Sequence, residues 1–448
     1  MRDILLRFIG DKTFYMRASR QIIPIIIQSF VTSLSGFADT IMASYFDGVS
    51  AVGTALQVDS LMQSVTFGIA SGVNIFVVQY FGAKDIYNMK RSFALSLLLV
   101  SSNALLWMFI SIIFNVDLLG LFISDADVAE QSFTYLKYSC FSFIFTSTIM
   151  SFSFAYHSVQ KTVVPFIIGA ITLVFHVILN YFLMFILGMG IEGAGLCMII
   201  TQMFSLILYI LYSVKTNQPF IGGFKYFKEL DFSFVKKIIR KIYPLIMNET
   251  LFGFGNSMFI VAYGRFGKSV MDCYYIGNQV VNIAYTVVNG VSDGATTLIG
   301  YELGRKNFDF VEREVNYFFG LTAFMSVLTI VFLLVFAPGI ASLFAIASQE
   351  SFNLAVSIIQ VLSLRVAFRL FNVIIFAALR SGGDSKFLAF LDSGILWIFG
   401  IGTTYLLIYG LSVSNIVIVI LISQIEQLVR LIIGLARINS KKWIKSLS

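Results

Sequence analysis

Charged residues are scarce in this sequence. Aspartate, glutamate, lysine and arginine make up only 12% of the 448 residues, whereas 58% are hydrophobic. Soluble globular domains carry about 25% charged residues. A chain with so few polar groups cannot cover its folded surface with them, so the composition excludes a protein that is soluble on its own.

Cysteine and histidine are also rare. The three cysteines lie in or beside apolar segments, and their spacing indicates neither a disulfide framework nor a metal site. Two histidines are too few for a His-rich metal site. The phosphate-binding pattern G-x-x-x-x-G-K-[ST] and an evident Ser/His/Asp set are both missing. We therefore expect no enzyme activity and no cofactor.

Long apolar stretches dominate the chain. Many are close to 20 residues, about the length that an α-helix needs to cross a hydrocarbon core of about 30 Å. A helix satisfies its own backbone hydrogen bonds there, and these stretches lack the alternation of a membrane β-barrel strand. We predict about twelve membrane helices, at residues 21–45, 56–80, 92–116, 131–156, 164–187, 193–214, 242–264, 275–300, 316–338, 353–379, 387–409 and 413–436.

Basic residues alternate from loop to loop along the chain. With the N-terminus inside, the inner segments hold most of them, and the outer loops are mainly acidic; Lys137, Arg265 and Lys268 are exceptions. Basic residues are retained on the cytoplasmic side of a membrane protein. We therefore expect a protein of the cell membrane with both termini in the cytoplasm. The net charge of +7 then reflects topology, and we expect no nucleic-acid partner.

The chain also contains an internal repeat. Residues 56–84 match residues 278–306 at an offset near 222, which aligns Gly68 with Gly290 and Gly72 with Gly294. We predict two six-helix bundles, 1–214 and 242–448, joined by a basic cytoplasmic linker at 215–241. Six is an even number, so both bundles enter from the same side and are related by a pseudo-twofold axis along the membrane normal. This all-α polytopic architecture suits alternating access; a channel fits less well, because no short filter-like segment is evident.

Four ordered motifs carry a family resemblance: "GFADTIMASYFDGVSAVG" at 36–53, "NYFLMFILGMGIEGAG" at 180–195, "NETLFGFG" at 248–255 and "ALRSGGDSKF" at 378–387. Together they resemble the multidrug and toxic compound extrusion (MATE) family over residues 20–437. The resemblance implies a V-shaped pair of bundles that exports organic, often cationic or amphipathic compounds in exchange for Na⁺ or H⁺. It also implies that Asp39, Asn180 and Glu249 couple ion flow to transport.

The sequence departs from the family at two places. Met184 stands where some relatives carry an aspartate, one turn after the asparagine. The segment 353–379 carries Arg365, Arg369 and Asn372 where other relatives carry an acid.

Asp39 lies deep in the first predicted helix. Charged residues at membrane depth cost at least about 2.5–3.5 kcal/mol on insertion scales and tend to face a cavity or a partner. The carboxylate of Asp39 could bind Na⁺ or carry a proton. In the alternative interpretation, it accepts hydrogen bonds from its neighbours Ser35 and Thr40.

Asn180 and His176 are four residues apart, so they share one face of a helix. The carbonyl oxygen of Asn180 could join Asp39 as a ligand of Na⁺. His176 could shuttle a proton at a cavity, since its unperturbed pKa is near 6.5, or it could simply be a packing residue.

Glu249 follows Pro244 by five residues. Proline can bend a membrane helix, which would make Glu249 a mobile acid near the inner opening. The alternative is an ion pair with Arg365 or Arg369, which lie on one face of a helix. Glu426 and Arg430 are also four apart, and we expect them to form an internal pair.

Two predicted helices carry polar stripes. One stripe lies in 275–300 and spans roughly 80° of the helix; the other lies in 56–80. We interpret both as cavity lining, with interhelical hydrogen bonding as the alternative. The stripes consist of Asn278, Asn282, Tyr285, Asn289 and Asp293, and of Ser60, Gln63, Ser64, Ser71 and Asn74.

The sequence therefore predicts a secondary antiporter that is embedded in the bilayer and transports small organic substrates. We expect this antiporter to be a monomer. The candidate ion-coupling residues are Asp39, Asn180 and Glu249. The candidate cavity residues are Gln63, His176, Asn278, Asn282, Tyr285, Asn289, Asp293 and Arg369. A lipid-linked saccharide flippase of the same superfamily is the alternative function.

Overall fold

The computed structural model describes residues 7–82, 84–159, 161, 163–304, 308–382 and 384–444. The side chains of a few positions inside these ranges, among them Pro24, Pro244 and Asp293, lie outside the described part. The predicted bend at Pro244 and the role predicted for Asp293 therefore stay predictions.

Helices make up most of the described chain, and no strand occurs in these ranges. The first half contains α2 (Lys12–Ser44), α3 (Val49–Gly82), α4 (Ile86–Gly120), α5 (Ala126–Ser139), α6 (Ser142–Ser158), α7 (Val163–Tyr181), η1 (Phe182–Ile186) and α8 (Gly190–Lys215). The short helix α9 (Lys225–Lys228) follows.

The second half begins with α10 (Phe232–Tyr263) and η2 (Gly264–Phe266). It continues with α11 (Lys268–Gly304), α12 (Phe308–Ala341), α13 (Gln349–Ser381), α14 (Ser385–Ala389), η3 (Phe390–Gly394), η4 (Leu396–Ile401), α15 (Gly402–Tyr405), η5 (Leu406–Gly410), α16 (Ile416–Ser423) and α17 (Ile425–Asn439). The predicted all-α membrane fold is thus confirmed.

Ten helices among the described residues are long and apolar enough to cross a membrane, or eleven if α5 and α6 form one broken span. The predicted segment 131–156 is divided between these two helices, which are bent by 57°. The predicted segment 275–300 lies in α11, where the polar stripe interrupts the apolar run. With these two, all twelve predicted segments correspond to helical parts of the structure.

The chain packs as two compact units. One unit contains residues 38–268, and the other contains residues 269–448 together with the N-terminal segment up to Phe37. We call them unit 2 and unit 1, respectively. The points of division fall inside α2 and at the start of α11, whereas the predicted boundaries fall at 214 and 242; those boundaries stay a prediction.

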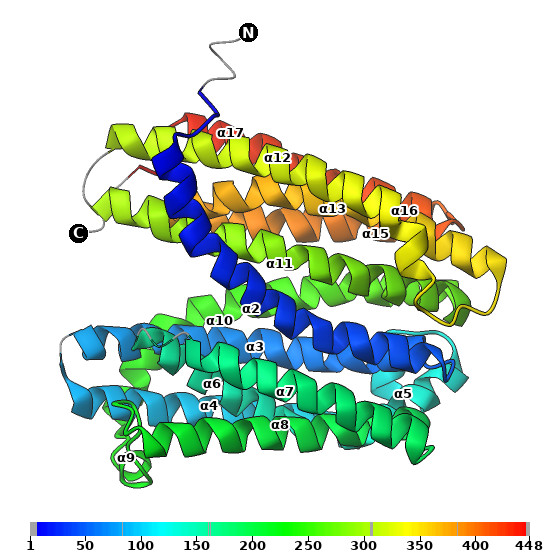
Figure 1. Ribbon diagram of the computed structural model, residues 1–448, viewed down its shortest axis with the longest axis horizontal. Coiled ribbons are helices and arrows are strands. Elements are labelled where there is room, and N and C mark those ends of the chain that lie inside the picture. Colours follow the sequence, from blue (N-terminus) through cyan, green and yellow to red (C-terminus); the bar gives the residue numbers. More distant parts are fainter. Residues whose placement is uncertain are drawn as a thin grey trace. The chain divides into compact units, whose positions relative to one another are not determined.

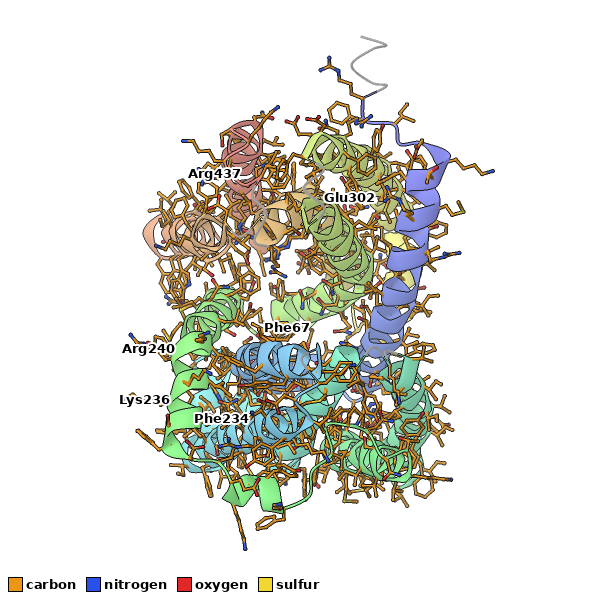
Figure 2. The ribbon with its side chains drawn as sticks, turned by 90° about the vertical axis from the view of Figure 1, so that its left-hand side faces the viewer. Phe67, Phe234, Lys236, Arg240, Glu302 and Arg437 are labelled. Atoms are coloured by element: carbon orange, nitrogen blue, oxygen red, sulfur yellow. The ribbon has the colours of Figure 1, made fainter. Side chains whose placement is uncertain are left out.

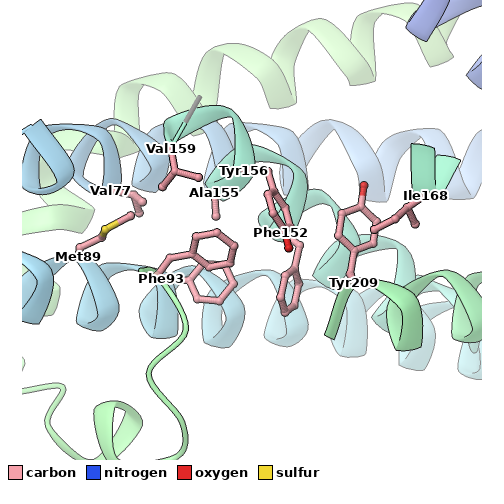
Figure 3. Packing of buried hydrophobic residues seen from close by; sticks show 10 residues of the cluster. Val77, Met89, Phe93, Phe152, Ala155, Tyr156, Val159, Ile168 and Tyr209 are labelled. Carbon is pink, nitrogen blue, oxygen red and sulfur yellow. The ribbon is translucent and has the colours of Figure 1, made fainter. Parts of the chain in front are cut away.

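Unit 2 is held together by an aromatic core. In this unit α3, α4, α6, α7 and α8 run side by side (Figure 1). Phe93 of α4 packs edge-on against Phe152 of α6, with ring centroids 5.1 Å apart, and against Phe220, at 5.0 Å. Tyr156 packs on the same ring of Phe220 at 5.1 Å. Figure 3 shows this cluster, which extends from Val77 to Ile168 and Tyr209.

Helix α10 belongs to this unit too, although it opens the second repeat. Gly68 and Gly72 of α3 lie against Ile246 and Ile242 of α10, closely enough that a Cβ atom on either glycine would stand 2.8 or 2.9 Å from the facing isoleucine. The missing side chains let the two helices approach. At the start of α10, Phe234 is buried, whereas Lys236 and Arg240 lie on the exposed side (Figure 2).

Unit 1 repeats this contact. Gly290 and Gly294 of α11, the repeat partners of Gly68 and Gly72, lie against Ile26 and Ile22 of α2 at 2.4 and 2.5 Å from the corresponding Cβ positions. In each unit, the second helix of one repeat thus packs against the first helix of the other repeat. The repeat seen in the sequence is real, but the first helices are exchanged between the units.

Candidate ion and substrate sites

Asp39 of α2 accepts two hydrogen bonds from one face of α7. Asn180 donates from Nδ2 to Oδ1 of Asp39 at 2.6 Å. The ring nitrogen Nε2 of His176 lies 2.7 Å from the same oxygen, and it donates to that oxygen when Asp39 is ionised, because an ionised carboxylate only accepts. All three residues are buried in unit 2, with 8%, 1% and 2% of their surface exposed for Asp39, Asn180 and His176. The structure therefore brings together three residues that the sequence singled out.

Two residues of α8 support the imidazole from behind. Oγ1 of Thr201 lies 3.3 Å from Nδ1 of His176, and Sγ of Cys197 lies 3.6 Å from it. Both residues are buried. Neither residue was predicted from the sequence, although their spacing of four residues places them on one face of α8, as it does for His176 and Asn180 on α7.

The oxygen Oδ1 of Asn180 is buried and has no hydrogen-bond partner in the described part of the chain. Buried amide oxygens are rarely left unsatisfied. The residues described contain no group of three or more His, Cys, Asp or Glu side chains that could hold a metal ion. At this site, the contacts above place the carboxylate of Asp39 and the amide oxygen of Asn180 side by side as oxygen ligands for Na⁺ as a transported ion.

The polar stripe of α3 proves to be mostly bonded within the helix or to its neighbours. The hydroxyls of Ser64 and Ser71 donate to the carbonyls four residues earlier, at 2.9 and 2.6 Å. Ser158 of α6 donates to Oδ1 of Asn74. Interhelical hydrogen bonding, the alternative interpretation, therefore describes Asn74.

Gln63 has an acidic partner that the sequence analysis missed. Its Nε2 donates to Oδ2 of Asp59 at 2.6 Å. Asp59 lies in the same helix, one turn before Gln63. It could have been predicted from the sequence as a carboxylate within an apolar run. The pair is a second place in unit 2 where an acid lies at membrane depth.

The polar stripe of α11 is only partly buried. Asn278, Asn282 and Tyr285 are half-buried, and Asn289 is exposed. Asp293 lies outside the described side chains. The assignment of this stripe to a cavity stays a prediction.

Glu249 is half-buried on α10 and faces α3, where its Cβ atom lies 3.4 Å from the Cβ position of Gly68. Arg365 and Arg369, its predicted partners, lie in the other unit. Arg365 lies 3.9 Å from Glu426 (Nη2 to Oε1), and Arg369 lies 3.4 Å from Asp392 (Nη1 to Oδ1). The pairing of Glu249 with either arginine stays a prediction.

The arginines of α13 belong to a polar cluster in unit 1. Arg430 lies 3.5 Å from Glu426, as predicted for these neighbours on α17, and its Nη2 also donates to the carbonyl of Asp392 at 2.7 Å. Arg430 and Glu426 are each 1% exposed. Asp392 was missed by the sequence analysis, although it is a single acid in an apolar segment.

A second cluster in unit 1 was also missed. Arg17 of α2 lies 3.2 Å from Oε1 of Glu302 on α11 and 3.3 Å from Oε1 of Glu314 on α12. The side chain of Glu314 is fully buried, and its Oε2 has no hydrogen-bond partner among the described residues. Figure 2 shows Glu302 where α11 approaches its end. One arginine thus holds together three helices of this unit.

Comparison with known proteins identifies similar chains. The sequence model of the MatE family matches residues 24–182 and 244–406, one stretch in each repeat. The "Uncharacterized transporter YisQ" of Bacillus subtilis is 24% identical over 97% of this chain and 96% of its own length. The "Probable multidrug resistance protein YoeA" of the same organism is 24% identical over 69% of this chain and 68% of its own length.

Solved structures share the fold. An inward-facing structure of a multidrug resistance MATE family transporter of the MOP superfamily superposes with a TM-score of 0.76, at 17% sequence identity, over 93% of this chain and 95% of that one. At this identity the likeness is one of fold.

Proposed function

Because this chain belongs to the MatE family, we propose that it exports small organic compounds in exchange for Na⁺ or H⁺. It is a multi-pass membrane protein, and transporters of its family are not enzymes. We expect substrates that are cationic or amphipathic, a location in the cell membrane and both termini in the cytoplasm. The similarity to YoeA, which is named a probable multidrug resistance protein, supports this class of substrate.

The observation that carries the proposal is the buried carboxylate of Asp39. Taking a charged group out of water is costly, and such residues in membrane helices tend to face an ion pathway or a partner. Asp39 is bonded by two donors from α7, beside an amide oxygen of Asn180 that lacks a hydrogen bond. A buried carboxylate beside a free amide oxygen supports a role in ion exchange, because a purely structural acid would not need the free oxygen beside it.

Alternating access supplies the mechanism. An ion or a substrate shifts the balance between two conformations only by as much as it binds one of them better. In this proposal, the coupling ion binds at Asp39 and Asn180, and Glu249 attracts a cationic substrate or holds a proton near the inner opening. The polar residues Gln63, Asn278, Asn282 and Tyr285 contribute to the cavity in which the substrate binds.

The proposal is tested by ethidium accumulation in drug-sensitive cells and by efflux from vesicles carrying an imposed Na⁺ or proton gradient. We expect gradient-driven efflux by the wild-type protein, and we expect Asp39→Asn and Glu249→Gln to fold but to lose it. Asp127→Asn, which changes an exposed carboxylate of α5, is the matched control and should transport normally.

Two results would count against the proposal. If Asp39→Asn exports ethidium as the wild type does, Asp39 has no coupling role. If the wild-type protein exports none of several organic cations under either gradient, the function itself is wrong, and lipid-linked saccharides become the next substrates to assay.

A further inference from the structure

The carboxylate of Asp39 faces hydrogen-bond donors, whereas an ion-binding site needs oxygen atoms. Two N–H groups, from Asn180 at 2.6 Å and from His176 at 2.7 Å, converge on Oδ1 of Asp39. A hard cation such as Na⁺ binds to oxygen lone pairs. To reach this oxygen, it would have to displace at least one N–H group.

The imidazole of His176 is held in its position as a donor. Its other ring nitrogen faces Oγ1 of Thr201 at 3.3 Å and Sγ of Cys197 at 3.6 Å. His176 is 2% exposed, and Thr201 and Cys197 are 1% and 0% exposed. Interiors of proteins are close-packed, so the ring cannot turn away from Asp39 without displacing buried neighbours on α8.

Nothing on the next turn of the chain replaces the blocked position. Met184 lies four residues after Asn180 and is fully buried. A thioether is a soft ligand that suits copper rather than sodium. The oxygen atoms of Asp39 and Asn180 that the N–H groups do not engage are Oδ1 of Asn180 and the second oxygen of Asp39.

We propose that His176 determines the ion specificity of this site by keeping an N–H donor on Oδ1 of Asp39, where it prevents the carboxylate from binding Na⁺ together with Asn180, so that transport is independent of sodium. This inference rests on the proposed function, since it concerns the ion that the same site exchanges. It also predicts that removing the imidazole creates a sodium site from the carboxylate of Asp39 and the unpartnered oxygen of Asn180.

The test measures sodium binding by the purified full-length protein, separately from transport. Thermal unfolding at constant pH and ionic strength is compared in NaCl, KCl and choline chloride, because a ligand that binds only the folded state raises the unfolding temperature. We expect no difference between the salts for the wild type. We expect a saturable rise in Tm in NaCl alone for His176→Ala.

Two further variants make the result specific. His176→Ser leaves a smaller gap and adds an oxygen, so it should gain the same sodium response if His176→Ala does not fold. His157→Ala removes the other histidine, which is exposed on α6, and should gain none. Adding Asn180→Leu to His176→Ala should abolish the gained response, because it removes the amide oxygen of the sodium site.

A general loss of packing lowers Tm in every salt, so it cannot mimic a response to sodium alone. A saturable sodium response of the wild-type protein, or its absence from both His176 variants, overturns the inference. In vesicles, efflux driven by a sodium gradient at equal pH on both sides would also overturn it. Failure of all gradient-driven efflux instead counts against the proposed function, and it leaves the binding measurement able to judge His176.

Discussion

The Cα atom of Ile246 on α10 lies 2.8 Å from the point at which a Cβ atom on Gly68 of α3 would stand. Real Cβ atoms do not come so close to a backbone atom, so the contact depends on the absence of a side chain. The same dependence recurs at Gly290, which faces Ile26 of α2.

Replacing Gly68 with alanine should therefore loosen the packing of α10. Alanine in a helix is normally favourable by about 1 kcal/mol relative to glycine, but forcing an extra carbon into a close-packed contact costs about 1–3 kcal/mol. We expect Gly68→Ala to lower the unfolding temperature of the detergent-purified protein. Gly169→Ala is the control, since no atom lies within 4 Å of its Cβ position, and it should be neutral or stabilising. Equal behaviour of the two variants would contradict the close contact.

Arg17 should stabilise unit 1, because its guanidinium binds two buried carboxylates and compensates their negative charge. Without the guanidinium, Glu302 and Glu314 are left as like charges with 5% and 0% of their side chains exposed. Loss of one partner of a charged hydrogen bond costs about 1–3 kcal/mol, and the partial exposure of Arg17 keeps the value in this range. We expect Arg17→Ala to lower the unfolding temperature.

Glu314→Gln should recover part of that loss when it is combined with Arg17→Ala, because it removes the repulsion. A double-mutant cycle measures the coupling. Additive effects of the two substitutions would show that the carboxylate and the guanidinium do not interact.

Asp231 should make stability sensitive to acid. The backbone N–H of Phe234 at the start of α10, which donates to the carboxylate, and the nearby Arg91 guanidinium hold the pKa of Asp231 below its usual range. A pKa that is lower in the folded state adds stability above the ordinary value of about 3.9, and this stability is lost as the pH falls through the folded-state pKa.

Between pH 5 and pH 3, the unfolding temperature of the wild type should thus fall more steeply than that of Asp231→Asn. Asparagine keeps the N-terminal cap of α10, but it cannot form an ion pair with Arg91 and it does not titrate. Asp85, whose pKa is also lowered, by the N–H of Asn88, is present in both proteins and cancels from the comparison. Parallel pH curves would show that Asp231 contributes nothing.

Separated halves of the chain should be unable to fold alone. A cut between Gly223 and Phe224 leaves α10 on the second fragment, although it packs in unit 2, and leaves α2 on the first, although most of it packs in unit 1. We expect fragments 1–223 and 224–448 to be degraded when expressed singly and to copurify when expressed together. Residues 38–268, which make up unit 2, should accumulate better than residues 1–223. Stable accumulation of each half alone would contradict the exchange of first helices.

The helices were predicted well from the sequence, because each membrane helix corresponds to one apolar run that is long enough to cross the bilayer. The break between α5 and α6 was missed, since no proline or glycine marks Cys140 and Phe141. The exchange of α2 and α10 was also beyond the sequence. The repeat aligns Gly68 with Gly290, but it does not predict which helix packs against each glycine.

Residues of the candidate site were predicted from the free-energy cost of a charge inside the membrane and from the spacing of polar residues along a helix. A carboxylate at membrane depth drew attention to Asp39, and the interval of four residues joined His176 to Asn180. Helical spacing says which residues share a face, but it does not say what lies opposite that face. The contact of His176 with Asp39, and the support from Thr201 and Cys197, therefore needed the structure. Arg17, Glu302 and Glu314 were missed for the same reason, since they come from three helices.

Phe220 has no exposed surface, because its ring is enclosed by Phe93, Phe152 and Tyr156. The first part of the basic stretch 215–241 is therefore anchored in the body of unit 2, and Phe232 begins α10 of the same unit. The chain that links these two parts starts after Phe220. Beyond it, Phe224 is 75% exposed. A domain or tag grafted next to Phe224 should leave the fold intact, whereas one grafted beside Phe220 would pull a side chain out of the interior.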